Sequence, residues 1–212
     1  ASPNFDHLAE SGLLFNNIFG TSHTSEIGNA SIFSGFPSVP EVSISMQPEK
    51  SRNLKSINQS LKPEGYKSSY LFGGDLTYGN IGGFFLDHGF DKVQDEKDFK
   101  GNLKRGKLNY YDEDLYNKFI KELRMSEEPF MNCVFTGSTH SPFDVPKVKG
   151  QNWTGKDSDF MNSLVYADQC LGDFIKKVKK ETWFNNTLFI FVADHSHTTP
   201  DVETPYLHDF YR

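Results

Sequence analysis

Apolar residues recur every three or four positions in several stretches of the chain, which is the spacing of one face of an α-helix. The clearest stretch runs from about Asp159 to Lys180, and Asp112–Leu123 has the same period. Shorter helices are predicted over 2–12, 27–33, 53–62 and 80–89. In the first of these, Ser2 suits the N-cap, Pro3 the first helical position and Gly12 the C-terminal end.

Other apolar stretches are continuous and rich in strand-forming residues. Thr187–Ala193 is of this kind, which is typical of a strand buried on both faces of a parallel sheet. Shorter strands are predicted over Leu13–Phe19, Ser68–Phe72 and Phe130–Thr136, the last of them buried. The polar stretch Lys92–Lys107 is predicted to be a surface excursion. Strands alternating with longer helices indicate a layered α/β fold, and 212 residues suit one such domain.

The composition and charge of the chain argue against several classes of function and of site. The net charge is −6 and the basic residues are scattered apart from Lys176–Lys180, so nucleic-acid binding is not expected. The chain contains no run of 18 apolar residues and does not begin with a signal peptide, which leaves the location of the intact protein open. Cys133 and Cys170 are too few for a disulfide framework or a zinc–thiolate site, and both are predicted to be buried free thiols.

Polar residues that could carry chemistry follow three of the predicted strands, where open α/β sheets bind their ligands. Asp194 and His195 directly follow the strand 187–193, and a carboxylate beside an imidazole is a compact ligand pair for Mn²⁺, Mg²⁺ or Zn²⁺. The simpler interpretation is a polar turn in which Asp194 caps the next helix. Gly73-Gly74-Asp75 is a weaker candidate, because paired glycines often form only a turn.

Two further side chains could act on a substrate. Thr24 lies just before a predicted helix, where the helix dipole and free N–H groups favour a phosphate or sulfate group and an alkoxide. Such a hydroxyl could equally serve only as a helix cap. His140 follows the strand 130–136 and could protonate a leaving group, or it could be an ordinary loop histidine.

Taken in order, several segments resemble the sulfatase-like domain of lipoteichoic acid synthases and phosphoglycerol transferases, within the alkaline phosphatase superfamily. The resemblance covers nearly the whole chain. Its segments are the opening 2–17, the nucleophile segment 23–26 with its end at 34–37, the strand and turn 70–75, the His-x-Pro-Phe type motif at 139–143, the helix 166–175 and the strand end 191–195.

The resemblance implies a three-layer α/β/α sandwich with a mostly parallel central sheet. It also implies that Thr24 is the nucleophile and a metal ligand, and that Asp194 and His195 are further ligands of one divalent ion, with Mn²⁺ favoured over Mg²⁺ or Zn²⁺. His140 and His197 would contact the substrate. The implied enzyme is a phosphotransferase that moves a phosphoglycerol-like head group from a lipid donor through Thr24 to an acceptor.

By the same resemblance, the chain is one catalytic domain of a bacterial cell-envelope enzyme. Such a domain lies on the extracytoplasmic side, periplasmic or extracellular, behind an upstream membrane segment. Residues 1–212 are expected to be truncated at both ends, with the first strand and its acidic metal ligand lying upstream. The Trp and Arg that glycerol-phosphate-handling members place near 79–81 are missing, so the head group stays open.

Two alternatives remain. One is a hydrolase of the same fold, either a phosphodiesterase or a sulfuric ester hydrolase. A formylglycine sulfatase is disfavoured because the nearest match to its Cys/Ser-x-Pro-x-Arg motif, at 38–42, has no arginine. The other alternative is a non-catalytic member that binds a head group or a glycan.

Overall fold

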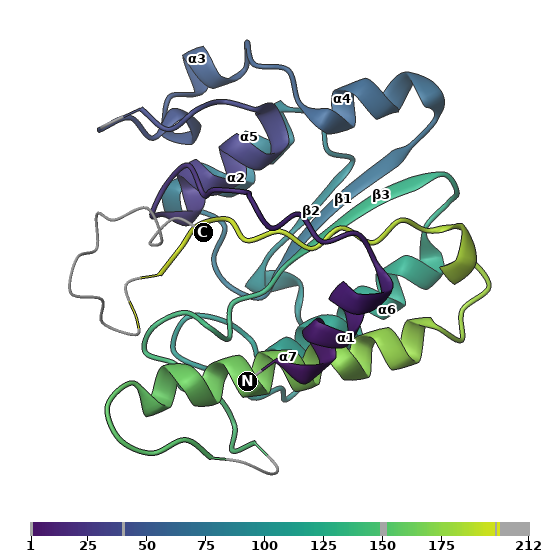
Figure 1. Cartoon of the computed structure of the whole chain (residues 1–212). Helices are drawn as coiled ribbons and strands as arrows, with labels where there is room; N and C mark the ends of the chain where they lie inside the picture. The colour runs from purple at the N-terminus through teal and green to yellow at the C-terminus, as the bar shows by residue number, and fades with distance from the viewer. Residues whose placement is uncertain (1, 40, 149–151, 198, 200–212) are drawn as a thin grey trace.

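The sheet at the centre of the molecule is parallel. A computed structural model describes residues 2–39, 41–148, 152–197 and 199. Within them β1 (Lys67–Phe72), β2 (Lys92–Gln94) and β3 (Phe130–Phe135) form a three-stranded sheet in the order β2-β1-β3. The chain leaves β1 toward β2 and then returns past β1 to β3, so the strand order reverses at the middle strand (Figure 1). Ligand sites in open α/β sheets lie at such reversals, beyond the carboxyl ends of the strands.

Helices cover both faces of this sheet, which confirms the predicted three-layer α/β/α arrangement (Figure 1). Helices α1, α6 and α7 lie on one face, and α2 and α5 lie on the other. The helices are α1 (Pro3–Ser11), α2 (Ser25–Ser34), α3 (Pro48–Ser51), α4 (Ile57–Leu61), α5 (Ile81–Asp87), α6 (Asp112–Met125) and α7 (Ser158–Val178). Short 3₁₀ turns occupy Ile44–Met46, Lys62–Glu64, Tyr78–Asn80, Glu96–Asp98 and Phe184–Asn186.

Adjacent residues of β1 serve the two layers of the core, because successive strand side chains point to opposite faces. Leu71 packs with α6 and α7, whereas Tyr70 packs with α2 and α5. The Tyr70 ring stacks on Phe85 with a centroid distance of 3.9 Å, and its hydroxyl donates to Asn29 Oδ1 over 2.8 Å. Burial raises the pKa of Tyr70 well above its usual range, so this hydroxyl remains a donor that ties β1 to α2.

Helix α1 is fixed to α7 by a single carboxylate. Asp168 Oδ2 accepts from the Asn4 backbone N–H (3.1 Å) and from Asn4 Nδ2 (2.7 Å), and its Oδ1 accepts from the Phe5 N–H (2.8 Å). The first N–H groups of a helix have no partner within the helix, so this carboxylate supplies one. Gly172 allows the close approach, since a Cβ there would lie 2.4 Å from Asn4 Oδ1.

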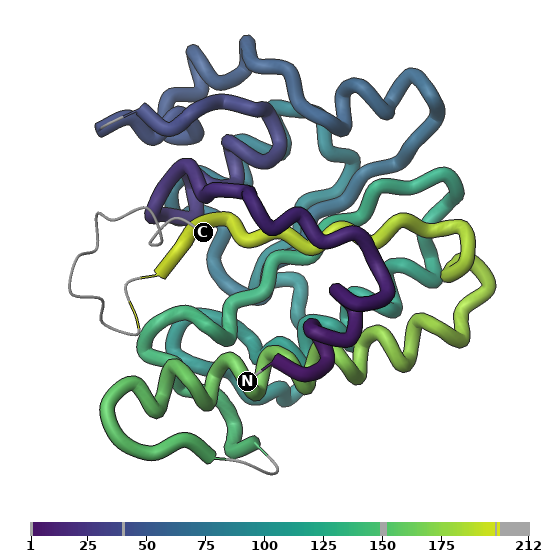
Figure 2. Tube along the Cα trace, in the orientation of Figure 1, coloured from purple at the N-terminus to yellow at the C-terminus, as the bar shows by residue number. Residues whose placement is uncertain are grey.

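Two predicted strands are wrong. Thr187–Ala193 forms no strand and is not buried, with Leu188 83% and Ile190 73% exposed. Leu13–Phe19 likewise forms no strand and is exposed. A strand needs a neighbour for its hydrogen bonds, and no described segment pairs with either of them. Figure 2 shows the two segments running alongside each other, and the Phe191 ring lies 6.3 Å from that of Phe5 in α1.

Smaller differences have local causes. The helix predicted over 53–62 is reduced to α4, because Ser56 and Gln59 form a capping box that starts the helix at Ile57. The excursion predicted over 92–107 begins with β2 and a 3₁₀ turn, and β3 is half-buried rather than buried. Both cysteines are free thiols, but Cys133 is only partly buried. Among the described helices, none is both long and apolar enough to cross a membrane.

Candidate active site at the carboxyl edge of the sheet

The loop that carries His140 is held in place by a buried carboxylate. Asp112, the first residue of α6, is 1% exposed and accepts from the backbone N–H groups of Gly137 and Ser138, both at 3.2 Å. The Ser138 hydroxyl in turn accepts from the Asp112 N–H. Burial raises the pKa of Asp112 in spite of these hydrogen bonds. The chain leaving β3 is therefore fixed two to three residues before His140.

Thr24 is the N-cap residue of α2, but its side chain does not cap the helix. Its backbone is extended and its hydroxyl accepts no hydrogen bond from the first turn. Instead, Thr24 Oγ1 donates to Glu26 Oε1 over 2.9 Å. The capping interpretation of this residue is therefore wrong, and the hydroxyl lies in the positive field at the start of a ten-residue helix.

Asp194 and His195 pack against the same first turn of α2. Ser25 Oγ lies 3.2 Å from His195 Nε2. Asp194 Oδ2 lies 3.5 Å from that nitrogen. Gly28 makes this packing possible, since a Cβ there would lie 2.1 Å from the Asp194 carbonyl oxygen. The structure thus brings Asp194 and His195 to the helix start that carries Thr24, although the segment before them is not a strand.

One cavity of about 220 Å³ contains most of the predicted site residues. We call it the histidine cavity; its lining residues are His23, Thr24, Ser25, Tyr78, His140, His195, Ser196 and His197. Thr24, His140, His195 and His197 come from three separate parts of the chain, and they meet here. A second cavity of about 280 Å³ lies beside α7 and contains none of the predicted site residues.

The hydrogen bonds of two histidines define which ring nitrogen is free. His195 Nδ1 lies 2.5 Å from the Ser196 carbonyl oxygen and His140 Nδ1 lies 2.7 Å from that of Ser141. A carbonyl can only accept, so both Nδ1 atoms carry a proton. In neutral His195, the lone pair of Nε2 is then available to a proton or a metal.

His197 has the opposite arrangement. Its Nδ1 accepts from the Thr199 N–H over 3.0 Å, and its ring stacks on Phe160 with a centroid distance of 5.4 Å. Burial lowers the pKa of His197, and the nearby His195 and His140 lower it further. At neutral pH the ring is therefore uncharged with its proton on Nε2, which makes this nitrogen a hydrogen-bond donor.

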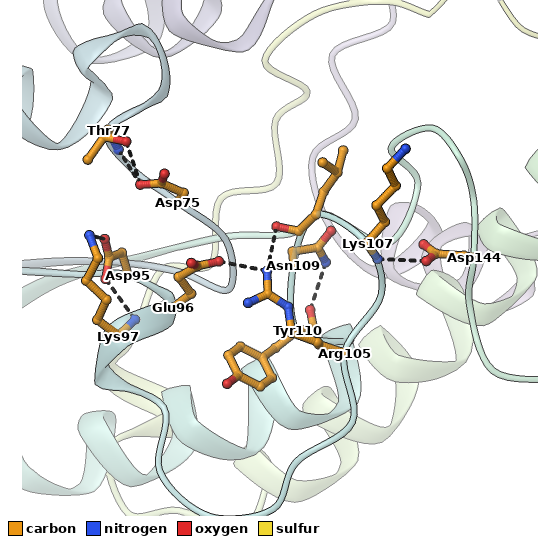
Figure 3. A network of polar contacts seen from close by, with 11 residues as sticks. Asp75, Thr77, Asp95, Glu96, Lys97, Arg105, Lys107, Asn109, Tyr110 and Asp144 are labelled. Atoms are coloured by element: carbon orange, nitrogen blue, oxygen red, sulfur yellow. Dashed lines mark hydrogen bonds and ion pairs between the residues drawn. The ribbon is translucent and has the colours of Figure 1, made fainter.

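Gly73-Gly74-Asp75 forms a turn outside the histidine cavity. Asp75 Oδ1 accepts from the Thr77 N–H (2.9 Å) and hydroxyl (2.7 Å), as Figure 3 shows. The backbone hydrogen bond from Thr77 is the main cause that lowers the pKa of Asp75. The turn interpretation accounts for this segment.

Two buried carboxylate oxygens near Thr24 have no hydrogen-bond partner among the described residues. They are Glu26 Oε2 and Asp194 Oδ2. An unpaired buried carboxylate oxygen is costly, and a divalent cation with oxygen and imidazole ligands would satisfy both. No group of three His, Cys, Asp or Glu side chains that could hold a metal occurs in the described part of the chain. A ligand set here would therefore include the Thr24 hydroxyl, and the donors present fit a divalent ion.

Three residues that the sequence analysis did not select belong to this site. Glu26 orients the Thr24 hydroxyl, Ser25 contacts His195, and Tyr78 lines the histidine cavity. Glu26 lies two positions after Thr24 at the start of the same helix, and this closeness in sequence could have identified it as a site residue. Tyr78 follows the Gly-Gly-Asp turn, and no feature of the sequence marked it.

Comparison with known proteins places the chain in a family. The profile of the Sulfatase family matches residues 1–209. Phosphoglycerol transferase I of Escherichia fergusonii is 26% identical over 150 residues, which cover 66% of this chain and 20% of that protein.

Solved structures show the same fold. A protein of the alkaline phosphatase superfamily from Vibrio parahaemolyticus gives a TM-score of 0.84 at 32% identity, over 92% of this chain and 48% of that one. The lipoteichoic acid synthase LtaP from Listeria monocytogenes gives 0.73 at 27% identity, over 84% of this chain and 46% of that one. Members of this superfamily use divalent metal ions.

The chain spans 20% of the length of the phosphoglycerol transferase that it matches. The family match nevertheless extends over nearly all of its residues, and the structural match over most of them. Its parallel sheet, covered by helices on both faces, agrees with that fold. This chain therefore belongs to the sulfatase family of enzymes, within the alkaline phosphatase superfamily.

Proposed function

We propose that this chain is the catalytic domain of a metal-dependent phosphotransferase, which moves a phosphoglycerol-like head group from a lipid donor to an acceptor hydroxyl. The observation that carries the proposal is the position of the Thr24 hydroxyl, which lines one cavity with His140 and His195 at the start of α2. The relatives named phosphoglycerol transferase I and lipoteichoic acid synthase support the same class of reaction.

Thr24, Asp194 and His195 would hold one divalent ion, with Mn²⁺ favoured and Mg²⁺ or Zn²⁺ compatible with the same oxygen and nitrogen donors. When bound, such an ion lowers the pKa of a hydroxyl and offsets the charge of a phosphate group. The two unpartnered oxygens of Glu26 and Asp194 support a cation at this position. The start of α2 adds a favourable field for the anionic substrate.

Each side chain then has a separate role in the reaction. Thr24 Oγ1 attacks phosphorus, its proton passes to Glu26, and the bond from phosphorus to the lipid oxygen breaks. The departing lipid alcohol takes its proton from His140. In the second step the acceptor hydroxyl attacks the Thr24-linked phosphodiester and gives its proton to His140, while Thr24 recovers its proton from Glu26. His197, with its proton on Nε2, donates a hydrogen bond to the head group.

Location follows from the resemblance. Relatives of the lipoteichoic acid synthase type have extracytoplasmic catalytic domains, which supports our proposal that this domain lies on the extracytoplasmic side of the membrane, periplasmic or extracellular. A lipid-borne donor fits that location, because its head group is presented at the membrane surface.

A covalent-adduct experiment tests the proposal. The protein is incubated with Mn²⁺ and phosphatidylglycerol, release of diacylglycerol is followed, and peptides are analysed by mass spectrometry. We expect a glycerophosphoryl adduct on Thr24 and a loss of turnover by about a thousandfold or more in Thr24→Ala. Ser25→Ala is the matched control, since this neighbouring hydroxyl contacts His195 but is not the nucleophile.

The outcomes separate the alternatives. An adduct on Ser25, or full turnover by Thr24→Ala, would show that Thr24 is not the nucleophile. An adduct on Thr24 that passes only to water would make the protein a phosphodiesterase. Turnover of sulfate esters in its place would make it a sulfuric ester hydrolase, and head-group binding without any adduct would make it a non-catalytic binding protein.

A further inference from the structure

The ring of His140 takes its position from the loop that carries it. His140 is exposed, and its Nδ1 donates to the carbonyl of the next residue, Ser141, over 2.7 Å. The backbone of the loop is also bonded to itself. The His140 N–H donates to the Gly137 carbonyl (3.0 Å), and the Phe143 N–H donates to the His140 carbonyl (2.9 Å). Because these hydrogen bonds lie within residues 137–143, the ring moves together with its loop.

The start of this loop is attached to the helix layer through Asp112. One carboxylate oxygen, Oδ1, holds two consecutive N–H groups, those of Gly137 and Ser138. Both residues are buried, so their N–H groups would lose their partner without gaining water if the carboxylate were removed. Gly137 also packs closely on Asn109, whose Cγ would lie 2.7 Å from a Cβ on that glycine. A displacement of this attachment would therefore be passed on to His140.

Asp112 itself belongs to a rigid frame. It is the first residue of α6, and Leu115 of the same helix is fully buried in the core between α6 and α7. Two residues before Asp112, the Tyr110 N–H donates to the carbonyl of Gly73, which directly follows β1 (2.8 Å). Since β1 and β3 are neighbours in the sheet, the carboxylate connects the ends of two adjacent strands. A side chain attached to such a frame is held more precisely than one on a free loop.

The attachments on the far side of the loop are weaker. Asp144 Oδ2 accepts from the Lys107 backbone N–H over 2.7 Å, as Figure 3 shows, but both residues are exposed. Water can replace a hydrogen bond of this kind, so its net contribution is small. The Phe143 ring packs against α7, but it too follows His140 in the sequence. The entry of the chain into the loop, and with it the position of the His140 ring, therefore depends on the buried carboxylate.

From this geometry we propose that Asp112 is a positioning residue for the transfer, which holds the His140 ring where the lipid alcohol departs from phosphorus. Asp112 is buried and does not line the histidine cavity, so it acts on the reaction only through the loop. The inference rests on the proposed function, since it concerns the proton that His140 delivers there. A displacement of a reacting group by about 1 Å can slow a reaction by about a hundredfold, so this attachment can control the rate.

A positioning role and a merely structural role differ in how the rate depends on the leaving group. An alkoxide is a poor leaving group and needs a proton from His140, whereas p-nitrophenolate is stable without one. If Asp112 acts through His140, its loss slows the release of an alcohol and spares the release of p-nitrophenolate. General damage to the fold or to the nucleophile would slow both.

The test variant is Asp112→Ser, because serine is favourable at a helix start but too short to hold both N–H groups. First-turnover release of the leaving group, with Mn²⁺ present, is measured for phosphatidylglycerol and for the p-nitrophenyl ester of glycerol phosphate. We expect diacylglycerol release to slow by about 10- to 100-fold and p-nitrophenolate release to stay close to that of the wild type. His140→Gln should have the same selectivity, and the double variant should be no slower than His140→Gln alone.

Asp114→Ser is the matched control, since it removes a carboxylate from the same first turn of α6 at a half-buried position, and it should leave both rates unchanged. Equal slowing of the two donors by Asp112→Ser, or slowing of neither, would overturn the inference. If Asp112→Ser does not fold, Gly137→Ala takes its place. Its Cβ would lie 2.7 Å from the Asn109 side chain and displace the loop from the opposite side, so the same selectivity is expected.

NMR signals of the His140 ring separate this inference from the proposed function, because they require no turnover. We expect them to shift or broaden in Asp112→Ser and to stay unchanged in Asp114→Ser, with His7 on α1 as an internal reference. This result in a protein that turns over no donor would support the positioning of His140 and contradict the phosphotransfer. Turnover by the wild type, with unchanged ring signals in both variants, would contradict the positioning and leave the phosphotransfer in place.

Discussion

Thr24 and Glu26 are joined by a hydrogen bond of 2.9 Å from the threonine hydroxyl to the glutamate Oε1. The same oxygen lies 3.3 Å from the Ser43 hydroxyl, while the other oxygen of Glu26 is buried without a described partner. Gly79 leaves room for this side chain: its φ is +55°, and a Cβ there would lie 2.4 Å from the Glu26 Cβ. Glu26 is thus held so that one oxygen orients the proposed nucleophile and the other is free to face a cation.

Replacement of Glu26 by Gln should weaken metal binding more than it disturbs the fold. The amide oxygen can still accept from Thr24, but the negative charge beside the proposed ion is lost. We expect divalent-ion affinity to fall by about 10- to 100-fold, the range for residues that support metal ligands. Calorimetric titration with Mn²⁺ measures this. Glu10→Gln, an exposed change on α1, is the control. Equal Mn²⁺ affinity in both variants would show that Glu26 does not take part in metal binding.

Gly28→Ala should separate α2 from Asp194. The new methyl group would lie 2.1 Å from the Asp194 carbonyl oxygen, which is backbone and cannot rotate away. We expect a loss of about 1–3 kcal/mol in the free energy of unfolding, as for other overpacked sites, together with loss of donor turnover. Chemical denaturation and a turnover assay check both.

Gly20→Ala is the matched control for that change. Its Cβ would meet the backbone of residues 195 and 196 at 3.6 Å or more, which is ordinary contact. It should leave both stability and turnover close to those of the wild type. Equal effects of the two alanines would contradict the close packing of α2 on Asp194.

The sequence predicted the helices better than the strands. The helix α7 was evident from its apolar period, because a helix makes its backbone hydrogen bonds within itself. The strand predicted at Thr187–Ala193 rested on its apolar composition and on the family resemblance at 191–195, and neither reveals whether a neighbouring strand is present to pair with it. The same reason explains the error at Leu13–Phe19.

For the candidate site, the sequence motifs selected four residues that line the histidine cavity, namely Thr24, His140, His195 and His197. They also selected Asp194, which packs against Gly28 of α2 and does not line the cavity. Their chemical roles stay predictions. Glu26 was missed because its role depends on a side-chain hydrogen bond that no motif encodes.

Asp91 should make stability depend on pH in the acid range. Its Oδ2 accepts from the Ser68 N–H (2.8 Å) and hydroxyl (3.1 Å) at the start of β1. The backbone hydrogen bond is the main cause that lowers the pKa of Asp91. A lowered pKa in the folded state stabilises the protein above the unfolded value of about 3.9, and this stabilisation is lost as pH falls through the folded pKa.

Thermal unfolding of the wild type and of Asp91→Asn between neutral and acid pH tests this expectation. The wild type should have the higher Tm at neutral pH, and the difference should shrink below about pH 4 as the carboxylate is protonated. Asp87→Asn, at the end of α5, is a control for general charge effects. A difference in Tm that stayed constant with pH would show that the charge of Asp91 does not contribute.

The exposed apolar segment 188–192 should make the 212-residue chain prone to self-association. It forms no regular secondary structure and is rich in strand formers, with Leu188 83% and Ile190 73% exposed, and such segments pair readily with those of other molecules. The double change Leu188→Thr and Ile190→Thr keeps strand propensity but lowers apolar exposure, so light scattering of concentrated solutions should decrease. Stability should change by no more than about 0.5 kcal/mol, since neither side chain is buried.

Leu86→Thr is the control for this change. Leu86 is 61% exposed but lies on α5, which offers no free backbone to pair, so its replacement should leave the scattering unchanged. If the double variant unfolds instead, these two side chains are packed in solution, contrary to their exposure in the structure.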